Sequence, residues 1–355
     1  MPTNPMIIDG HNDTLLALFY PKAGKERSFF KASDMGHIDL PRANAGGLGG
    51  GFFAVFVPNP PREDDPEQES PFPGEDMDDD DLRYEMPLPP ELEPGYALRF
   101  AIGMVQTLYK LEVEAKGAAR IVHNVADIRQ CLQEGSLAMI LHFEGAEPID
   151  PDLHALHVFH AAGLRSLGIV WSRPNRYAHG VPFSFPASPD TGPGLTDAGK
   201  RLVRTCNELG ILVDLSHLNE KGFWDVAKIS SAPLVATHSG VHALCKTPRN
   251  LTDDQLDAIA ESGGLVGVNF HTGFLRSDGR ADKETSLSEI VRHVAYIADR
   301  CGIEHVALGS DFDGAYMPDD LKDAAGLPRL LAALRKYGFD DASVAKIAQE
   351  NWLRV

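Results

Sequence analysis

Cysteine is scarce in this chain of 355 residues. Its four cysteines lie far apart and form no Cys-x-x-Cys pair, which excludes a zinc ribbon and gives no sign of a disulfide framework. Apolar runs are also short, because none approaches the roughly 18 residues of a membrane span. The first expected strand begins at Met6, which leaves no room for a signal peptide, and the C-terminus has no hydrophobic tail. We therefore expect a soluble, cytoplasmic protein without a membrane anchor.

Positive charge is in deficit. The chain has 33 lysines and arginines against 51 acidic residues, and this net charge of −18 disfavours nucleic acids and anionic membranes as partners. The excess is concentrated between Arg62 and Glu93, where fourteen acidic residues face two arginines, a net −12. This proline-rich stretch cannot bury much apolar surface. We expect residues 62–93 to form a solvated acidic insertion loop, with a cation-binding segment as the alternative.

Eight short runs rich in β-branched and apolar residues recur along the chain, each ending in polar or glycine-rich sequence. Most are almost continuously apolar, as expected for parallel strands that are covered on both faces. The eight predicted strands are Met6–Gly10, Gly51–Val57, Leu137–His142, Ser166–Val170, Ile211–Leu215, Leu234–Thr237, Leu265–Phe270 and His305–Gly309.

Helical patterns lie between these runs. Thr252–Ser262 is a clear example, because Thr252 can cap the helix and Gly263 and Gly264 stop it. The other predicted helices are Pro94–Gly117, Thr196–Leu209, Thr285–Arg300 and Asp341–Trp352. Alternating strands and helices predict an α/β fold, a (β/α)8 TIM barrel that forms one domain over residues 1–355, with the acidic loop inserted after the second strand. A doubly wound open sheet is the alternative.

Titratable residues follow the ends of five predicted strands, where a barrel places its catalytic groups. His11 and Asp13 are two apart in extended chain, so their side chains point the same way, and both residue types bind zinc. The remaining residues of this kind are Glu144, His217, His238 and Asp311. One carboxylate between two pairs of ligands suits a centre of two divalent metals.

The motifs around these residues closely resemble the membrane (renal) dipeptidase family, whose members are binuclear zinc peptidases of the amidohydrolase-type barrel superfamily. The resemblance runs in order from residue 6 to the C-terminus, with the acidic insertion outside it. It is carried by Asp9-Gly-His11-Asn-Asp13, Glu144-Gly, Asp214-Leu-Ser-His217, Thr237-His238-Ser239, Pro248-Arg249-Asn250, Gly309-Ser-Asp311-Phe-Asp-Gly314 and the ending Glu350-Asn-Trp-Leu-Arg354-Val.

The resemblance implies a role for each matching position. His11 and Asp13 would bind one zinc, His217 and His238 the second, and Glu144 would bridge both, giving two Zn2+ per chain, although other divalent metals are open. Asp311 would be the acid/base residue, and Arg249 would receive the terminal carboxylate of a dipeptide. Asp313 is expected to fix the turn instead. These roles imply hydrolysis of a peptide bond by a metal-activated hydroxide, including substrates with a D-residue at the C-terminus.

One position departs from the family pattern. Members of the renal type have a histidine just after the fourth strand, where this chain has Trp171. An indole offers one hydrogen-bond donor and cannot ionise, so Trp171 can wall the pocket or donate to the oxyanion.

Other interpretations stay open. A related binuclear-zinc hydrolase could act on an N-acyl amino acid, a lactone or a β-lactam, since a fold does not fix the substrate. A non-catalytic binding protein is a more remote alternative, because no ligand position is missing. His154, His157 and His160 share one helical stripe, which we interpret as part of a packing helix. His142 is expected to be a buried structural histidine. A dipeptide is the expected partner, and a homodimer is left open.

Overall fold

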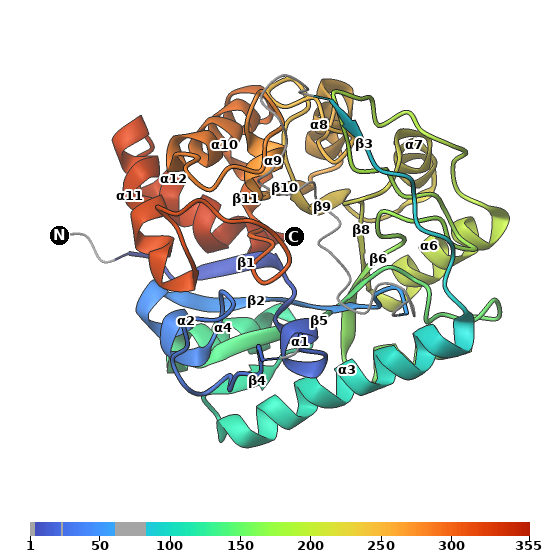
Figure 1. The fold of residues 1–355 in the computed structure, drawn as a ribbon, viewed down its shortest axis with the longest axis horizontal. Coiled ribbons are helices and arrows are strands. Elements are labelled where there is room, and N and C mark those ends of the chain that lie inside the picture. The colour runs from blue at the N-terminus through green and yellow to red at the C-terminus, as the bar shows by residue number, and fades with distance from the viewer. Residues whose placement is uncertain (1–3, 23, 61–82) are drawn as a thin grey trace.

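The computed structural model describes residues 4–22, 24–60 and 83–355. A continuous parallel sheet runs in the order β1-β2-β5-β6-β8-β9-β10-β11 (Figure 1). Its strands are β1 (Ile7–Asn12), β2 (Leu48–Phe56), β5 (Leu137–Glu144), β6 (Leu164–Gly168), β8 (Leu212–Asp214), β9 (Val235–Ser239), β10 (Leu265–Val268) and β11 (Val306–Leu308). All eight coincide with the predicted strands, and their ends differ by at most three residues. A short further strand, β4 (Ala119–Ile121), pairs with β5 outside this path.

Backbone contacts close the sheet into a barrel. The Asp311 N–H donates to the His11 carbonyl at 3.0 Å, and the Asp13 N–H donates to the Phe312 carbonyl at 2.8 Å. The carboxylate of Asp9, on β1, accepts hydrogen bonds from the backbone and hydroxyl of Ser310. The segment after β11 is thereby joined to β1. The predicted (β/α)8 barrel is confirmed, and the open doubly wound sheet is wrong.

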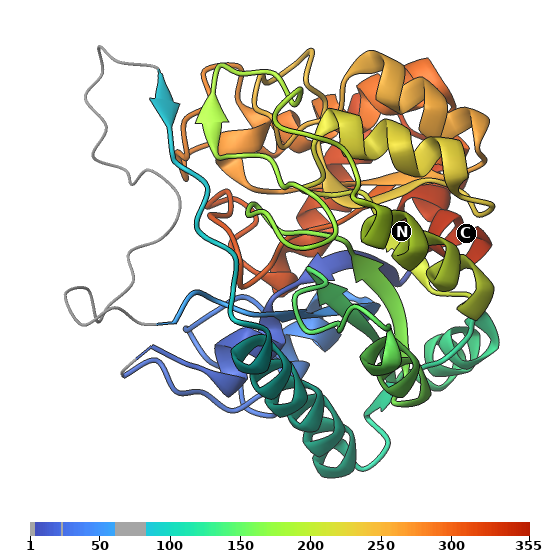
Figure 2. The same cartoon turned by 90° about the vertical axis from the view of Figure 1, so that its right-hand side faces the viewer.

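Helices surround the strands in both views (Figures 1 and 2). They are α1 (Thr14–Phe19), α2 (Leu40–Gly46), α3 (Pro94–Ala115), α4 (Val125–Glu134), α5 (His154–Ala161), α6 (Asp197–Leu209), α7 (Glu220–Ile229), α8 (Asp253–Glu261), α9 (Thr272–Leu275), α10 (Leu287–Cys301), α11 (Leu327–Tyr337), α12 (Asp341–Ala345) and α13 (Asn351–Arg354). Helix α8 begins at Thr252 with a capping box to Gln255, which explains why its start could be predicted. None of the helices in the described residues is long and apolar enough to cross a membrane.

The interior of the barrel is filled by its own apolar cluster below the mouth. Ile8, Phe52 and Ile140 belong to this cluster, together with Trp352 from the C-terminal helix. The Trp352 indole N–H donates to the Leu308 carbonyl at 3.1 Å and its ring lies 4.9 Å from that of Phe52. The charged side chains at the other end of the strands therefore lie above a packed apolar layer.

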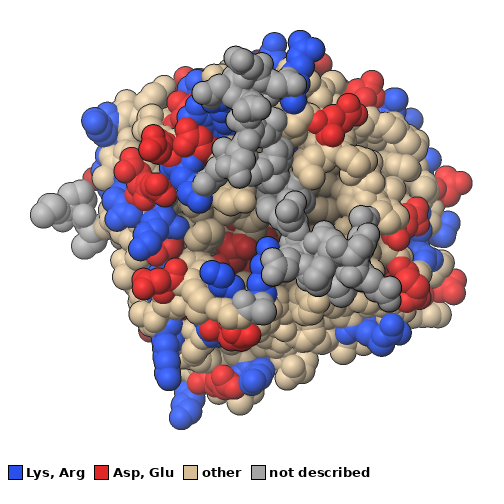
Figure 3. Space-filling model, viewed as in Figure 1, with Lys and Arg blue, Asp and Glu red and all other residues tan. Residues whose placement is uncertain are grey.

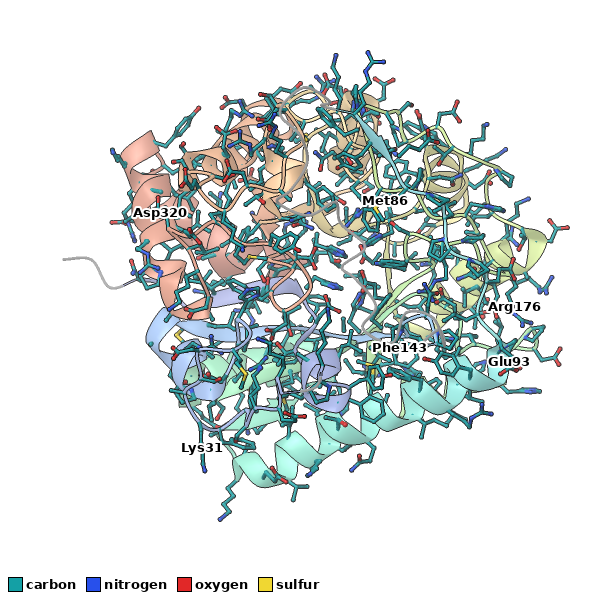
Figure 4. All side chains as sticks on the ribbon, in the orientation of Figure 1. Lys31, Met86, Glu93, Phe143, Arg176 and Asp320 are labelled. Atoms are coloured by element: carbon teal, nitrogen blue, oxygen red, sulfur yellow. The ribbon has the colours of Figure 1, made fainter. Side chains whose placement is uncertain are left out.

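The end of the acidic insertion is more ordered than the sequence indicated. Residues 62–82 lie outside the described residues, but Tyr84–Glu85 forms strand β3, which pairs antiparallel with β7 (Ser184–Phe185) (Figure 2). The backbone N–H of Met86, labelled in Figure 4, donates to the Phe183 carbonyl. Residues 83–93 are exposed or half-buried, as expected of a solvated loop, and depart from the prediction only in this two-residue strand. Two-residue strands carry no periodicity by which a sequence could indicate them.

Candidate active site

The titratable residues predicted from the strand ends meet at one end of the barrel. His11 belongs to β1, Glu144 ends β5 and His238 belongs to β9, so strand geometry aims these side chains. The others stand in the turns just past the strands: Asp13 after β1, His217 after β8 and Asp311 after β11. All six are buried. Figure 3 shows a hollow near the middle of this face with acidic side chains at its floor.

The two carboxylate oxygens of Glu144 face different groups. Oε1 lies 3.0 Å from Nε2 of His217 and 3.5 Å from Nε2 of His238. Oε2 lies 3.7 Å from Nε2 of His11, whose same nitrogen is 3.4 Å from Oδ2 of Asp13. Glu144 therefore lies between two pairs of possible metal ligands, His11 with Asp13 and His217 with His238.

These residues fit divalent metal ions. Both ring nitrogens of His11 and Oδ1 of Asp13 are buried without a hydrogen-bond partner among the described residues. Burial alone would lower the pKa of His11, but the charges of Glu144 and Asp13 raise it to about 10. The negative charges of these carboxylates therefore stabilise a cation at this point. Imidazole and carboxylate ligands in close groups of three are what a zinc ion requires.

Hydroxyl groups hold the far nitrogen of two histidines. Oγ1 of Thr237 lies 2.9 Å from Nδ1 of His238 and donates to the Asp214 carboxylate at 2.6 Å. Because that hydroxyl proton goes to Asp214, its oxygen accepts from His238 Nδ1–H, leaving Nε2 with a free lone pair. Ser172 Oγ lies 2.9 Å from Nδ1 of His217. Burial keeps the pKa of both histidines well below the ordinary value, so both are neutral.

Asp311 faces the centre from the closing turn. One of its oxygens groups with the ring nitrogens of His11 and His238, while Oδ2 accepts a hydrogen bond from the amide of Asn269 at 2.9 Å. Burial raises the pKa of Asp311, and the charge of Asp13 adds to the rise. A carboxyl with a raised pKa is suited to holding and releasing a proton near neutral pH. Sequence reasoning assigned no role to Asn269, Thr237 or Ser172.

Arg249 and Trp171 lie beside this centre, in the segments that follow β9 and β6. Arg249 is buried, donates from Nη2 to the His238 carbonyl at 3.0 Å and packs over the ring of Phe274. Burial lowers the pKa of Arg249 to about 10, so it remains a cation at neutral pH. Trp171 is half-buried, with its ring 6.0 Å from that of His217.

Four other histidines and one aspartate that the sequence analysis considered lie outside the centre. His142 is buried with Nδ1 2.9 Å from Ser166 Oγ, as expected of a structural histidine. Asp313 accepts hydrogen bonds from Thr14, Arg27 and the His37 backbone, and so fixes the turn. His154, His157 and His160 lie on α5, which packs against the protein through Leu156 and Phe159, as expected of a packing helix, while the histidines themselves are exposed or half-buried.

A comparison with known protein families agrees with this site, and its match covers almost the whole chain. Membrane dipeptidase (peptidase family M19) matches residues 2–355. The chain belongs to the membrane dipeptidase family. It is thus a metallo-dipeptidase by family, with the barrel fold of that family. The predicted resemblance is confirmed.

Several known proteins are similar to this chain. A metallo peptidase from Rhodobacter sphaeroides, solved with a phosphinate mimic of the dipeptide L-Ala-D-Ala, is 48% identical, with a TM-score of 0.92 over 99% of this chain and 98% of that chain. An uncharacterized protein in the pqqA 5′ region of Klebsiella pneumoniae is 50% identical over 262 residues, 74% of this chain and 97% of that protein. The probable dipeptidase PvdM from Pseudomonas aeruginosa, 23% identical, shares the fold with a TM-score of 0.81 over 99% of this chain and 94% of that chain.

Proposed function

We propose that this dipeptidase works with two zinc ions, one held by His11 and Asp13, the other by His217 and His238, with Glu144 shared between them. The observation that carries this proposal is the division of the two Glu144 oxygens between the two groups. The bound ions would polarise the scissile carbonyl and lower the pKa of the attacking water from about 15.7 to about 7.

Asp311 is the proposed acid/base residue. It would accept a proton from the attacking water and deliver it to the departing amine, which cannot leave as an anion. The Asn269 amide holds Oδ2 at 2.9 Å, so the orientation of the carboxylate is set before substrate arrives. Because the pKa of Asp311 is raised, protonating its carboxylate near neutral pH costs less free energy than protonating an ordinary aspartate.

Arg249 is the proposed recognition group for the C-terminal carboxylate of a dipeptide. A planar guanidinium can bind a carboxylate through two parallel hydrogen bonds. The hydrogen bond from Arg249 to the His238 carbonyl fixes the guanidinium relative to the end of β9, which carries a proposed metal ligand. A D-residue at the C-terminus belongs to the proposed substrate range, supported by the L-Ala-D-Ala mimic in the Rhodobacter sphaeroides protein. Trp171 is proposed as a substrate-binding residue beside His217.

The alternative is a hydrolase of N-acyl amino acids, lactones or β-lactams at the same centre. The experiment that separates them assays a dipeptide library, complete in stereochemistry, beside N-acyl amino acids and lactones, with metal analysis of the same preparation. We expect free dipeptides to be cleaved most efficiently and about two zinc ions per chain. Cleavage of lactones or N-acyl amino acids in preference to every dipeptide would reject the proposal.

A further inference from the structure

An aromatic surface stands beside the proposed metal centre, built from Phe56 and Trp171. Phe56 ends β2 and is paired in register with Glu144, while Trp171 follows β6. Their rings lie 5.0 Å apart, and the Trp171 ring is 6.0 Å from that of the proposed ligand His217. Both side chains are half-buried. We call this pair the aromatic wall.

Phe56 and Arg249 lie on opposite sides of the barrel, because β2 and β9 are four strands apart in the closed order, whereas Trp171 follows β6, two strands from β9. In the strand order, β2 and β6 flank β5, which carries Glu144. Arg249 instead belongs to the loop after β9, and it packs on Phe274 of α9, which follows β10. Figure 1 shows β2 and β5 on the far side of the barrel from β9, β10 and β11. A dipeptide whose carboxylate is held by Arg249, with its peptide bond at Glu144, therefore has its N-terminal residue toward Phe56, with Trp171 beside that ring.

Arg173 supports the wall from behind. The centre of its guanidinium lies 5.1 Å from the Trp171 ring and 5.6 Å from the Phe56 ring. Its Nη1 donates to the Val57 carbonyl at 2.9 Å and lies 3.8 Å from the carboxylate of Glu147. Arg173 thus connects the chain just after three neighbouring strands, β2, β5 and β6.

The charge of Arg173 is balanced where it stands. The side chains of Arg173 and Glu147 are 1% and 5% exposed, so the pair is shielded from the pocket. The face that the wall presents is therefore apolar, since the cation is covered by the two rings. Cation–π contacts of this kind are attractive, so they favour the ring positions that contact Arg173.

We propose that the aromatic wall is the subsite for the side chain of the N-terminal residue of the substrate, that it favours apolar side chains there, and that Arg173 is its positioning residue. This inference rests on the proposed dipeptidase function. It assigns Trp171 to side-chain recognition, not to donation of a hydrogen bond to the oxyanion.

The first test compares kcat/KM for Leu-Ala and Gly-Ala in the wild type and in Trp171→Ala. Burying a leucine side chain against the wall should favour Leu-Ala about tenfold in the wild type. Trp171→Ala should lose more on Leu-Ala than on Gly-Ala, so that this ratio falls toward one. Trp224→Ala is the matched control, because Trp224 lies on α7 and is 38% exposed, and it should keep the wild-type ratio.

The outcomes separate the wall from the proposed function. A wild-type ratio near one would overturn the assignment of the wall as a side-chain subsite. Equal losses of kcat/KM on both substrates in Trp171→Ala would also overturn it and would point to an oxyanion role for Trp171. Failure of the wild type to cleave any dipeptide would instead reject the proposed function. A preference for Glu-Ala over Gln-Ala that disappears in Arg173→Met would also overturn the inference, because Arg173 would then bind substrate directly.

The second test examines Arg173 as a positioning residue. Arg173→Met should lower the Leu-Ala to Gly-Ala ratio through a higher KM for Leu-Ala, with zinc content retained. Arg173→Lys should restore part of the ratio, because a cation remains beside the rings although the planar stack is lost. If Arg173→Met does not fold, Phe56→Ala tests the same wall from β2. Loss of kcat on both substrates with an unchanged ratio would contradict the positioning role.

Discussion

The proposed carboxylate clamp gives a prediction whose size can be worked from the structure. Arg249 is fixed at one end by its 3.0 Å hydrogen bond to the His238 carbonyl, and its Nε is buried without a hydrogen-bond partner among the described residues. Burial lowers its pKa only to about 10, so it is protonated at neutral pH. Guanidinium donors are thus available to a carboxylate at neutral pH.

Lysine is the informative replacement at this position. The charge of Arg249 lowers the pKa of Glu144 and of Asp311, so a neutral side chain would disturb the centre as well as the clamp. Arg249→Lys keeps the charge but cannot form two parallel hydrogen bonds. A hydrogen bond to a charged group contributes about 1.5–3 kcal/mol, so we expect kcat/KM for a free dipeptide to fall about ten- to a hundredfold.

The assay is a cycle of two enzymes and two substrates, the free acid and the C-terminal amide of one dipeptide. Amidation should cost the wild type a factor similar to that of Arg249→Lys, and the double change should cost less than the product of the two, since both remove the same contact. Zinc content, measured on each preparation, should stay unchanged. Equal wild-type rates on acid and amide would refute the clamp and remove the main argument for dipeptides over other amides.

The remaining predictions concern the metals, the proton and acid stability. Elemental analysis of the unchelated enzyme should give about two zinc ions per chain, and chelation should abolish activity; one ion or none would reject the binuclear centre. Asp311→Asn should lower kcat by about 10²–10⁴ with both metals retained, whereas a larger loss in Asp313→Asn would reverse the assignment. Burial lowers the pKa of His293 to about 4, so its contribution to stability is complete above about pH 6.5 and is lost as the pH falls toward 4. In urea unfolding, His293→Gln should reduce the pH dependence of the free energy of unfolding over this range by about 3 kcal/mol, and an unchanged pH dependence would show that His293 is protonated in the folded protein.

The fold was predictable because its strands are covered on both faces. A strand such as Leu137–Glu144 is buried along its whole length, so it is read as an almost continuous apolar run. Eight such runs separated by helices leave few topologies, and the right-handed barrel places every strand end on one face. The meeting of Glu144 with His217 and His238 followed from that topology, not from any local signal.

The supports of the site could not be predicted in the same way. Ser172, Thr237 and Asn269 are ordinary polar residues whose importance depends on the rotamer and loop path that bring each within 2.9 Å of its partner. Arg173 is another example, because an arginine in a loop is usually exposed and this one is enclosed by two rings. Such contacts join segments far apart in the chain, and no spacing in the sequence records them.

Backbone conformation explains why two aspartates in one turn do different work. Asp311 and Asp313 both adopt left-handed conformations, with φ of 62° and 68°, which costs about 1–3 kcal/mol for each non-glycine residue. The Asp313 carboxylate offsets this cost by accepting from Thr14 Oγ1 at 2.8 Å and from Arg27 Nη2 at 2.7 Å. Its own N–H donates to Nδ1 of His37 at 2.8 Å. With its oxygens engaged, Asp313 anchors the turn, and the same turn directs Asp311 toward the proposed metal ligands with one carboxylate oxygen among their nitrogens.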